Sequence, residues 1–140
     1  MIAARNVVSG TFGELWFDDE KIAEIRKFDS SIEGNRETIM MGGDMMEDSK
    51  LMSAKGVGSM EIYKVYSRFA EFAAAYQRGE DPRGKFVGKV ADPDAHGTER
   101  WAFYNVAFDA VPVLAFEVGK PLSETVKFRF TKCEPLETIV

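Results

Sequence analysis

The sequence predicts a mainly β protein, an antiparallel β-sandwich or barrel with one α-helix. Short runs with β-like character recur along the chain, and only one segment has a clear helical period. The chain has 140 residues, of which 45% are hydrophobic, and this is enough apolar material for one core. No internal repeat, low-complexity tract or Pro/Ser-rich linker divides it, so we expect a single domain over residues 1–140.

The first expected element is a β-hairpin. The strand-like run Glu14–Phe17 leads into the polar turn Asp18–Lys21, and strand character resumes over Ile22–Ile32. The alternation slips between Ile25 and Phe28, which indicates a β-bulge in the second strand.

Two later strands differ in their alternation. In Thr125–Lys132 the apolar side chains share one face and the polar ones share the other, so one face is buried and one meets water. In Arg100–Phe108 both faces are apolar, which predicts a strand covered on both sides. One face holds Trp101 and Phe103, and the other holds Ala102, Tyr104, Val106 and Phe108. The remaining expected strands are Glu37–Met41, Met60–Tyr66, Lys85–Ala91 and Val113–Val118, the last with Leu114, Phe116 and Val118 in phase.

One amphipathic helix is expected near the middle of the chain. Its apolar face is formed by residues at helical spacing, namely Phe69, Phe72, Ala73 and Tyr76. Ser67 is a suitable N-cap, Gly79 can end the helix, and Asp81-Pro82 prevents its continuation.

The segment Gly42–Gly58 has neither period and is expected to be a long loop between strands. Its apolar residues Met45, Met46, Leu51 and Met52 stand among charged and polar ones. Disordered segments seldom carry so many apolar side chains, and methionine adapts well to a surface that another molecule supplies. We therefore interpret the loop at about 42–58 as an interaction arm; the alternative is a loop folded back onto its own core.

Composition excludes several functions. The formal net charge of −5 comes from mixed charges without a basic block, which disfavours sequence-independent nucleic-acid binding. Neither a signal peptide nor an apolar run long enough for a membrane helix is recognisable, so we expect no membrane anchor. The single cysteine, Cys133, cannot form an internal disulfide, and we interpret it as a passive residue rather than a reactive thiol.

Catalytic and metal-binding patterns are weak. The single histidine, His96, excludes sites that need two histidines, and its neighbours Asp92 and Asp94 lie in a Pro/Gly turn rather than a ligand motif. Gly10–Gly13 and Gly56–Gly58 lack the context of a phosphate loop and are interpreted as bends. We expect no enzyme activity, no metal and no cofactor.

Several segments together carry a family resemblance over essentially the whole chain. They are Val8–Asp18, Ile39–Gly42, Gly56–Phe69, Gly97–Arg100 with Tyr104–Val106, and Val126–Phe130 before an acidic, proline-containing end. In their order and spacing the chain resembles the tail tube proteins of contractile-tailed phages of Gram-positive hosts, the family represented by the defective Bacillus prophage PBSX. None of these segments is a catalytic motif.

The resemblance implies a tail-tube fold, similar to that of the type VI secretion tube protein, and a mechanical function. Hexameric rings would stack into a hollow tube that sheath contraction drives through an envelope. The expected partners are further copies of the chain, the tail sheath, and baseplate and tail terminator proteins, with DNA only as passing cargo in a complete phage. The expected location is a virion tail or a bacteriocin-like particle, assembled in the bacterial cytoplasm.

Under this interpretation, contacts between subunits or rings would use Met45, Met46, Leu51, Met52, Trp101 and Phe103. The two-sided strand and the apolar arm would then be covered by neighbours. An acidic lumen that does not hold DNA is a further hypothesis. The alternatives are another ring-forming injection-system component, such as a secreted tube or a baseplate tube initiator, and a monomeric β-barrel binding module.

Overall fold

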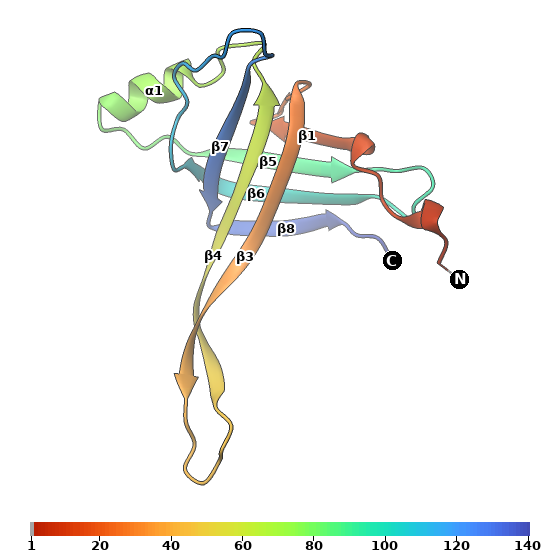
Figure 1. The fold of residues 1–140 in the computed structure, drawn as a ribbon, viewed down its shortest axis with the longest axis vertical. Coiled ribbons are helices and arrows are strands. Elements are labelled where there is room, and N and C mark those ends of the chain that lie inside the picture. The colour runs from red at the N-terminus through yellow and green to blue at the C-terminus, as the bar shows by residue number, and fades with distance from the viewer. Residues whose placement is uncertain (1) are drawn as a thin grey trace.

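Two layers of β-strands and one short helix make up the fold of the computed structural model, which describes residues 2–140 (Figure 1). The chain begins with two 3₁₀ turns, η1 (Ala4–Asn6) and η2 (Gly10–Phe12). The strands are β1 (Gly13–Phe17), β2 (Glu20–Lys21), β3 (Ile25–Ile39), β4 (Asp48–Tyr63), β5 (Gly84–Val90), β6 (Glu99–Phe108), β7 (Ser123–Phe130) and β8 (Lys132–Glu137). The helix α1 spans Ala70–Gln77. Every strand pair is antiparallel, so the predicted mainly β, antiparallel fold is confirmed.

The strand β6 connects the two layers. The continuous order is β2-β1-β5-β6-β7-β4-β3, and β8 also pairs with β6. The first half of β6 lies between β5 and β8, whereas Ala107 and Phe108 at its end pair with β7. Figure 1 shows β3, β4 and β7 running across the layer formed by β5, β6 and β8. The layers are therefore two crossed sheets joined at a corner, as in orthogonally packed β-sandwiches.

Aromatic rings fill the space between the sheets. Phe86 and Phe128, from opposite layers, are among the largest fully buried side chains, and their ring centroids lie 5.0 Å apart. Phe28 of β3 stacks on Phe128 at 5.6 Å and meets Phe103 at 5.7 Å. Contacts of this kind prefer offset or edge-to-face geometry and add to the burial of apolar area.

A bulge in β6 changes which of its side chains face the core. Asn105 has a positive φ of 56°, and three residue steps on β6, from Phe103 to Val106, oppose two on β5. Phe103, Val106 and Phe108 consequently belong to one core cluster. The prediction that Phe103 faces away from Val106 and Phe108 was wrong, because the extra residue inverts the alternation.

The predicted first hairpin is only partly correct. Asp18 and Asp19 form a two-residue turn with φ of 48° and 67°, as in a type I′ turn, but β1 pairs only with the two-residue β2. After a turn at 23–24 the chain crosses to the other layer, where β3 pairs with β4. The expected bulge near Ile25 is confirmed by the register shift between Ile25 and Lys27.

The helix α1 packs over one end of the sandwich, as predicted, but begins at Ala70 without a side-chain cap from Ser67. Phe69 is buried, and the Tyr76 hydroxyl donates a hydrogen bond to the Phe108 carbonyl at 2.7 Å. Gly79, with φ of 78°, ends the helix. Its N–H bonds the Tyr76 carbonyl and the Glu80 N–H bonds the Ala75 carbonyl, which is a Schellman motif.

Two segments, one predicted as a loop and one as a strand, have a different secondary structure in the protein. The predicted long loop 42–58 is mostly strand, since β3 and β4 form one long hairpin connected by residues 40–47, and the predicted strand Glu37–Met41 supplies the end of β3. Conversely, the predicted strand Val113–Val118 has no regular secondary structure and joins β6 to β7. The predicted strand Met60–Tyr66 is the end of β4, which stops at Tyr63.

Candidate assembly surfaces

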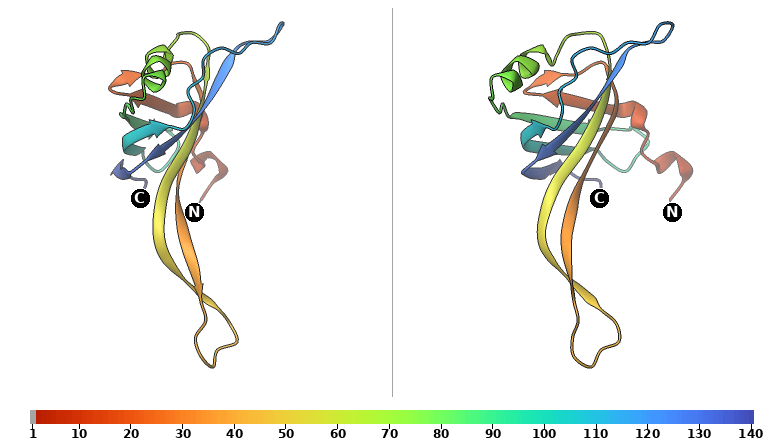
Figure 2. Two further views of the ribbon diagram at one scale, coloured as in Figure 1. Left: turned by 90° about the vertical axis from the view of Figure 1, so that its left-hand side faces the viewer. Right: turned by 60° about the vertical axis from the view of Figure 1, so that its left-hand side comes forward.

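The long β3–β4 hairpin extends beyond the sandwich. Figure 2 shows its distal half projecting away from the rest of the chain as a two-stranded ribbon. Every residue from 29 to 55 is exposed, so neither face of this ribbon is covered. We call residues 32–55 the arm. An isolated two-stranded ribbon is only marginally stable in water, and a neighbouring molecule would supply the missing cover.

The four apolar arm residues singled out from the sequence all meet solvent. Met45 and Met46 lie in the connecting loop and are 96% and 85% exposed, and Leu51 and Met52 lie on β4 and are about half exposed. Met52 is the extra residue of a bulge, since Asn35 pairs with Ser53 and Arg36 with Leu51. The Leu51 side chain lies across the hairpin over Gly34, where a Cβ would come within 2.7 Å of it.

The other two predicted contact residues lie inside the body of the chain. Trp101 is half-buried and packs against the core, and Phe103 is 4% exposed within it. Phe103 therefore offers almost no surface to a neighbour. Both side chains line an open groove between β3 and the sheet that contains β1, β5 and β6. The groove has a volume of about 850 Å³.

This groove runs beside the free edge of β3. Residues 25–28 and 30–32 form one wall, β1, β5 and β6 form the other, and Phe130 and Cys133 contribute at the end where β7 passes into β8. Because β3 is the outermost strand, the backbone groups on its far side have no strand partner among the residues described. Such an edge can accept a further strand.

An apolar segment lies at the opposite edge of the same layer. Residues 109–122 connect β6 to β7, and Figure 2 shows this connection projecting from the end opposite the arm. Its large side chains are exposed: Val113 by 75%, Leu114 by 78%, Phe116 by 70% and Val118 by 92%. We call residues 113–118 the exposed segment.

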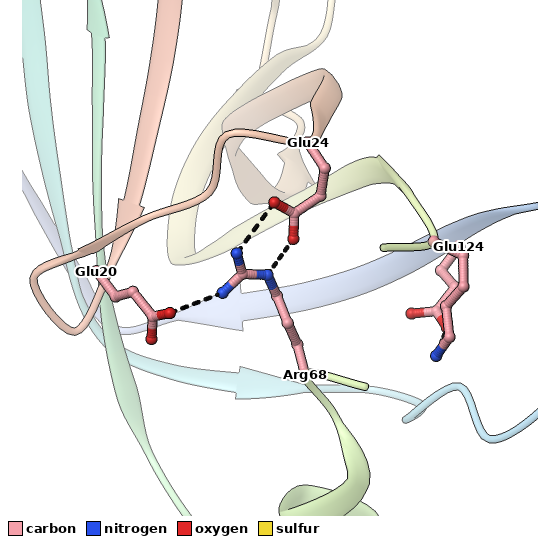
Figure 3. Close-up of polar contacts among 5 residues, drawn as sticks. Glu20, Glu24, Arg68 and Glu124 are labelled. Atoms are coloured by element: carbon pink, nitrogen blue, oxygen red, sulfur yellow. Dashed lines mark hydrogen bonds and ion pairs between the residues drawn. The ribbon is translucent and has the colours of Figure 1, made fainter. Parts of the chain in front are cut away.

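A buried ion pair fixes the junction between β4 and α1 (Figure 3). Arg68, just before the helix, donates from Nε and Nη2 to the two carboxylate oxygens of Glu24, and from Nη1 to Glu20 at 3.2 Å. The Glu24 side chain is only 5% exposed. The hydrogen bond from Arg68 lowers the pKa of Glu24, while the Glu24 carboxylate raises the pKa of Arg68. Close by, Lys64 pairs with the largely buried Glu124 at 2.7 Å.

In the turn of Asp92, Asp94 and His96, which was considered as a metal site, the Asp92 carboxylate binds backbone N–H groups. Asp92 is buried, and its two oxygens accept hydrogen bonds from the backbone N–H groups of Ser9 and Asp94, each at 2.9 Å. His96 is exposed. Within residues 2–140, no group of three or more His, Cys, Asp or Glu side chains is placed to hold a metal ion. Across the same residues, no helix has the length and apolarity needed to span a membrane.

Two features of these surfaces escaped sequence reasoning. The Arg68–Glu24 pair joins residues 44 positions apart and belongs to no motif, so only the fold brings it together. Gly56 and Gly58 were interpreted as bends but lie inside β4, opposite Phe130 and Phe128. Their alternation with Val57 in a run of otherwise strand-compatible residues was the available signal.

Comparisons with known proteins agree on one family. The profile of a protein family described as phage tail tube protein matches residues 1–137. The phage-like element PBSX protein XkdM of Bacillus subtilis (strain 168) is 33% identical over 132 residues, covering 92% of this chain and 90% of that protein.

Solved structures with the same fold include parts of an anti-feeding prophage and of a contractile injection system. The tube terminating cap of an anti-feeding prophage matches with a TM-score of 0.76 at 8% identity, covering 99% of this chain and 96% of the other. A chain from the sheath-tube complex of an extracellular contractile injection system matches with a TM-score of 0.72 at 8% identity, covering 94% and 92%. At these identities the likeness concerns the fold alone.

Proposed function

Because the chain belongs to the phage tail tube protein family and is a structural component of a tail tube, we propose that its copies close into hexameric rings which stack into a hollow tube. Sheath contraction would drive this tube through an envelope. The observation that carries the proposal, beyond family membership, is the arm, which no part of its own chain covers.

The arm serves as the contact between rings. Among the described residues, the two strands of the arm pair only with each other, so the arm reaches beyond the sandwich as a hairpin with open outer edges. Its apolar side chains then become buried only on the next ring, where each fully buried one contributes about 1.5–3 kcal/mol. Met45, Met46, Leu51 and Met52 are the residues we assign to this contact.

The tube forms inside a phage tail or a tail-like particle, with the sheath around it and a terminator at its end. The matches to a sheath-tube complex and a terminating cap support these partners. Baseplate proteins would nucleate the first ring, assembly would take place in the bacterial cytoplasm, and DNA would pass only in a complete phage. Tail tube proteins are in general structural rather than enzymes, and we infer no catalytic role for this chain.

A tube terminating cap or tube initiator is the second candidate. It is favoured by the structural match to the cap of the anti-feeding prophage. The two functions differ in copy number, since a tube protein repeats along the particle and a cap occurs only at its end. Quantitative mass spectrometry of purified particles separates them by the molar ratio of this chain to the sheath protein.

The tube proposal is tested by negative-stain electron microscopy of the purified chain at high concentration, alone and with sheath and baseplate proteins. Wild type should give rings or hollow tubes, and a variant with Met45, Met46, Leu51 and Met52 changed to serine should lose the stacking. A matched variant with Met45, Met46 and Met52 changed to leucine keeps the arm apolar and should still assemble. Featureless monomers of wild type under every condition would instead favour the monomeric binding module.

A further inference from the structure

We propose that the groove beside β3 receives the exposed segment, residues 113–118, of a neighbouring copy of this chain. This inference rests on the proposed ring and names the parts of the chain that form its subunit contact. In this contact the segment adds a strand to the free edge of β3 and inserts Leu114, Phe116 and Val118 into the groove.

β3 and the exposed segment each have backbone N–H and C=O groups that a second strand could pair. β3 is the last strand of its layer, so over residues 25–39 its outer N–H and C=O groups have no strand partner within residues 2–140. Residues 111–117 form no regular secondary structure within their own chain. Six extended residues span about 20 Å, which is shorter than the eight-residue stretch of β3 along the groove. Pairing of the two would satisfy both backbones, as in other cases of strand addition.

The side chains of the segment have the period of a strand with one apolar face. Leu114, Phe116 and Val118 alternate with Ala115 and Glu117, and all three are more than two-thirds exposed. A strand places alternate side chains on one face, so these three would point together into the groove. The groove offers them the apolar side chains of Ile25, Phe28, Ile32 and Trp101, none of which is fully buried.

The positions of the segment and the groove favour a second copy over the same one. The segment links β6 to β7, whereas the groove lies along β3 at the other edge of that layer, and Figure 1 shows the two edges on opposite sides of β4. A contact between different surfaces of identical chains is heterologous and can close into a ring.

The alternation supplies the first test. Two double variants are compared with wild type in the ring and tube assay, Leu114→Ser with Phe116→Ser, and Val113→Ser with Ala115→Ser as the opposite-phase control. Thermal unfolding of the unassembled chains should be nearly unchanged in both, because all four residues are exposed. We expect the first variant to require at least tenfold more protein for ring formation and the control to assemble like wild type. Equal loss or equal retention in both variants overturns the proposal.

The lone cysteine supplies the second test, since Cys133 lines the groove and is half-buried. In wild type, labelling of Cys133 by a maleimide should slow at least tenfold on assembly. A Phe116→Cys variant should give intermolecular cross-links to Cys133 with a short bismaleimide, and a Met46→Cys variant should not. Cross-links from Met46→Cys alone would place the arm in the groove and overturn the proposal.

These outcomes separate the inference from the proposed function. If wild type forms tubes while Cys133 stays open to maleimide, the tube stands and the groove contact is wrong. If wild type forms no ring with sheath and baseplate proteins present, the proposed function fails and this contact fails with it.

Discussion

Gly56 and Gly58 stand inside β4 because phenylalanine rings of β7 occupy the space where their side chains would be. A Cβ at Gly56 would lie 2.3 Å from the Phe130 ring. One at Gly58 would lie 2.5 Å from both the Phe128 ring and the backbone oxygen of Asp29. Rings laid over glycines in a neighbouring strand cover the exposed backbone that glycine leaves. The two glycines therefore set how closely the rings approach β4.

Gly58→Ala should destabilise the chain. Because backbone as well as ring atoms block the new methyl group, we expect a loss of about 1–3 kcal/mol in the free energy of unfolding. Gly42→Ala is the control, since a Cβ there meets nothing within 4 Å. Urea unfolding followed by circular dichroism measures the stability of both variants. Equal stability would show that β4 and β7 can move apart enough to accommodate the extra methyl group.

The Arg68–Glu24 pair should make stability depend on pH. The pKa of Glu24 is lowered from 4.5 in the folded chain, mainly by its hydrogen bond with Arg68. Its contribution is thus fully present above pH 4.5 and is lost as the pH falls through the lowered folded-state pKa.

Arg68→Ala leaves Glu24 buried without its cation and should cost on the order of 3 kcal/mol at neutral pH. The difference from wild type should shrink as the pH falls, because burial raises the pKa of the unpaired carboxyl in the variant and the wild-type pair loses its contribution below pH 4.5. Chemical unfolding from pH 7 to pH 3 gives the comparison. Arg78→Ala serves as the control, because its pair with Glu80 lies at the surface and should contribute at most about 1 kcal/mol. A constant difference in the free energy of unfolding between wild type and Arg68→Ala from pH 7 to pH 3 would contradict the stabilising role of the Arg68–Glu24 pair.

At the scale of elements, the arm stands out because every one of its residues is exposed over the length of both strands. Its strands are held by the ladder between β3 and β4, with an exposed Lys55–Glu33 pair at 3.6 Å and an exposed hydrogen bond from Arg36 to Ser49. Local opening should therefore require much less free energy here than in the core strands.

Hydrogen exchange should report this difference. In the unassembled chain, amides of residues 32–39 and 48–55 should exchange at least tenfold faster than those of β6 and β7, and in tubes they should become protected. Mass spectrometry of peptides from both states measures the change. The core peptides are the internal reference, and fast exchange of the arm in assembled tubes would exclude it as a ring contact.

Periodicity predicted elements well where one face of a strand is buried. β7 was found because Val126, Phe128 and Phe130 alternate toward the core. The arm was taken for a loop because both of its faces meet solvent, so nothing selects an apolar alternation along Ser49–Lys55. The exposed segment shows the reverse, an alternation without a strand partner in its own chain.

Alternation alone also cannot reveal strand partners or bulges. Residues 22–32 were assigned to pair with β1, yet β3 pairs with β4, because the chain turns at 23–24 and crosses to the other layer. The extra residue at Asn105 shifted Phe103 to the core side, so its assignment as a contact residue came from a wrong phase. Met45 and Met46, by contrast, were assigned to the interaction arm by composition alone; both are exposed, and their contact with a neighbour stays a prediction.

At the scale of the whole molecule, three surfaces point in different directions. The arm projects from one end and the exposed segment from the other (Figure 2). The groove opens along the edge of β3. Contacts along the tube and around the ring can thus be made by separate parts of one chain. Additivity of distant sites predicts that arm and segment variants weaken assembly independently.

The arm shares no buried residue with the core, so changes in one need not disturb the packing of the other. If the arm contacts the next ring as proposed, substitutions that selection would remove from the sandwich can accumulate in the arm, provided that the matching surface of the next ring changes too. Two tube proteins with interchangeable cores could then cease to copolymerise after a few such changes. A cell that carries several related prophages would in this way build each tube from its own subunits.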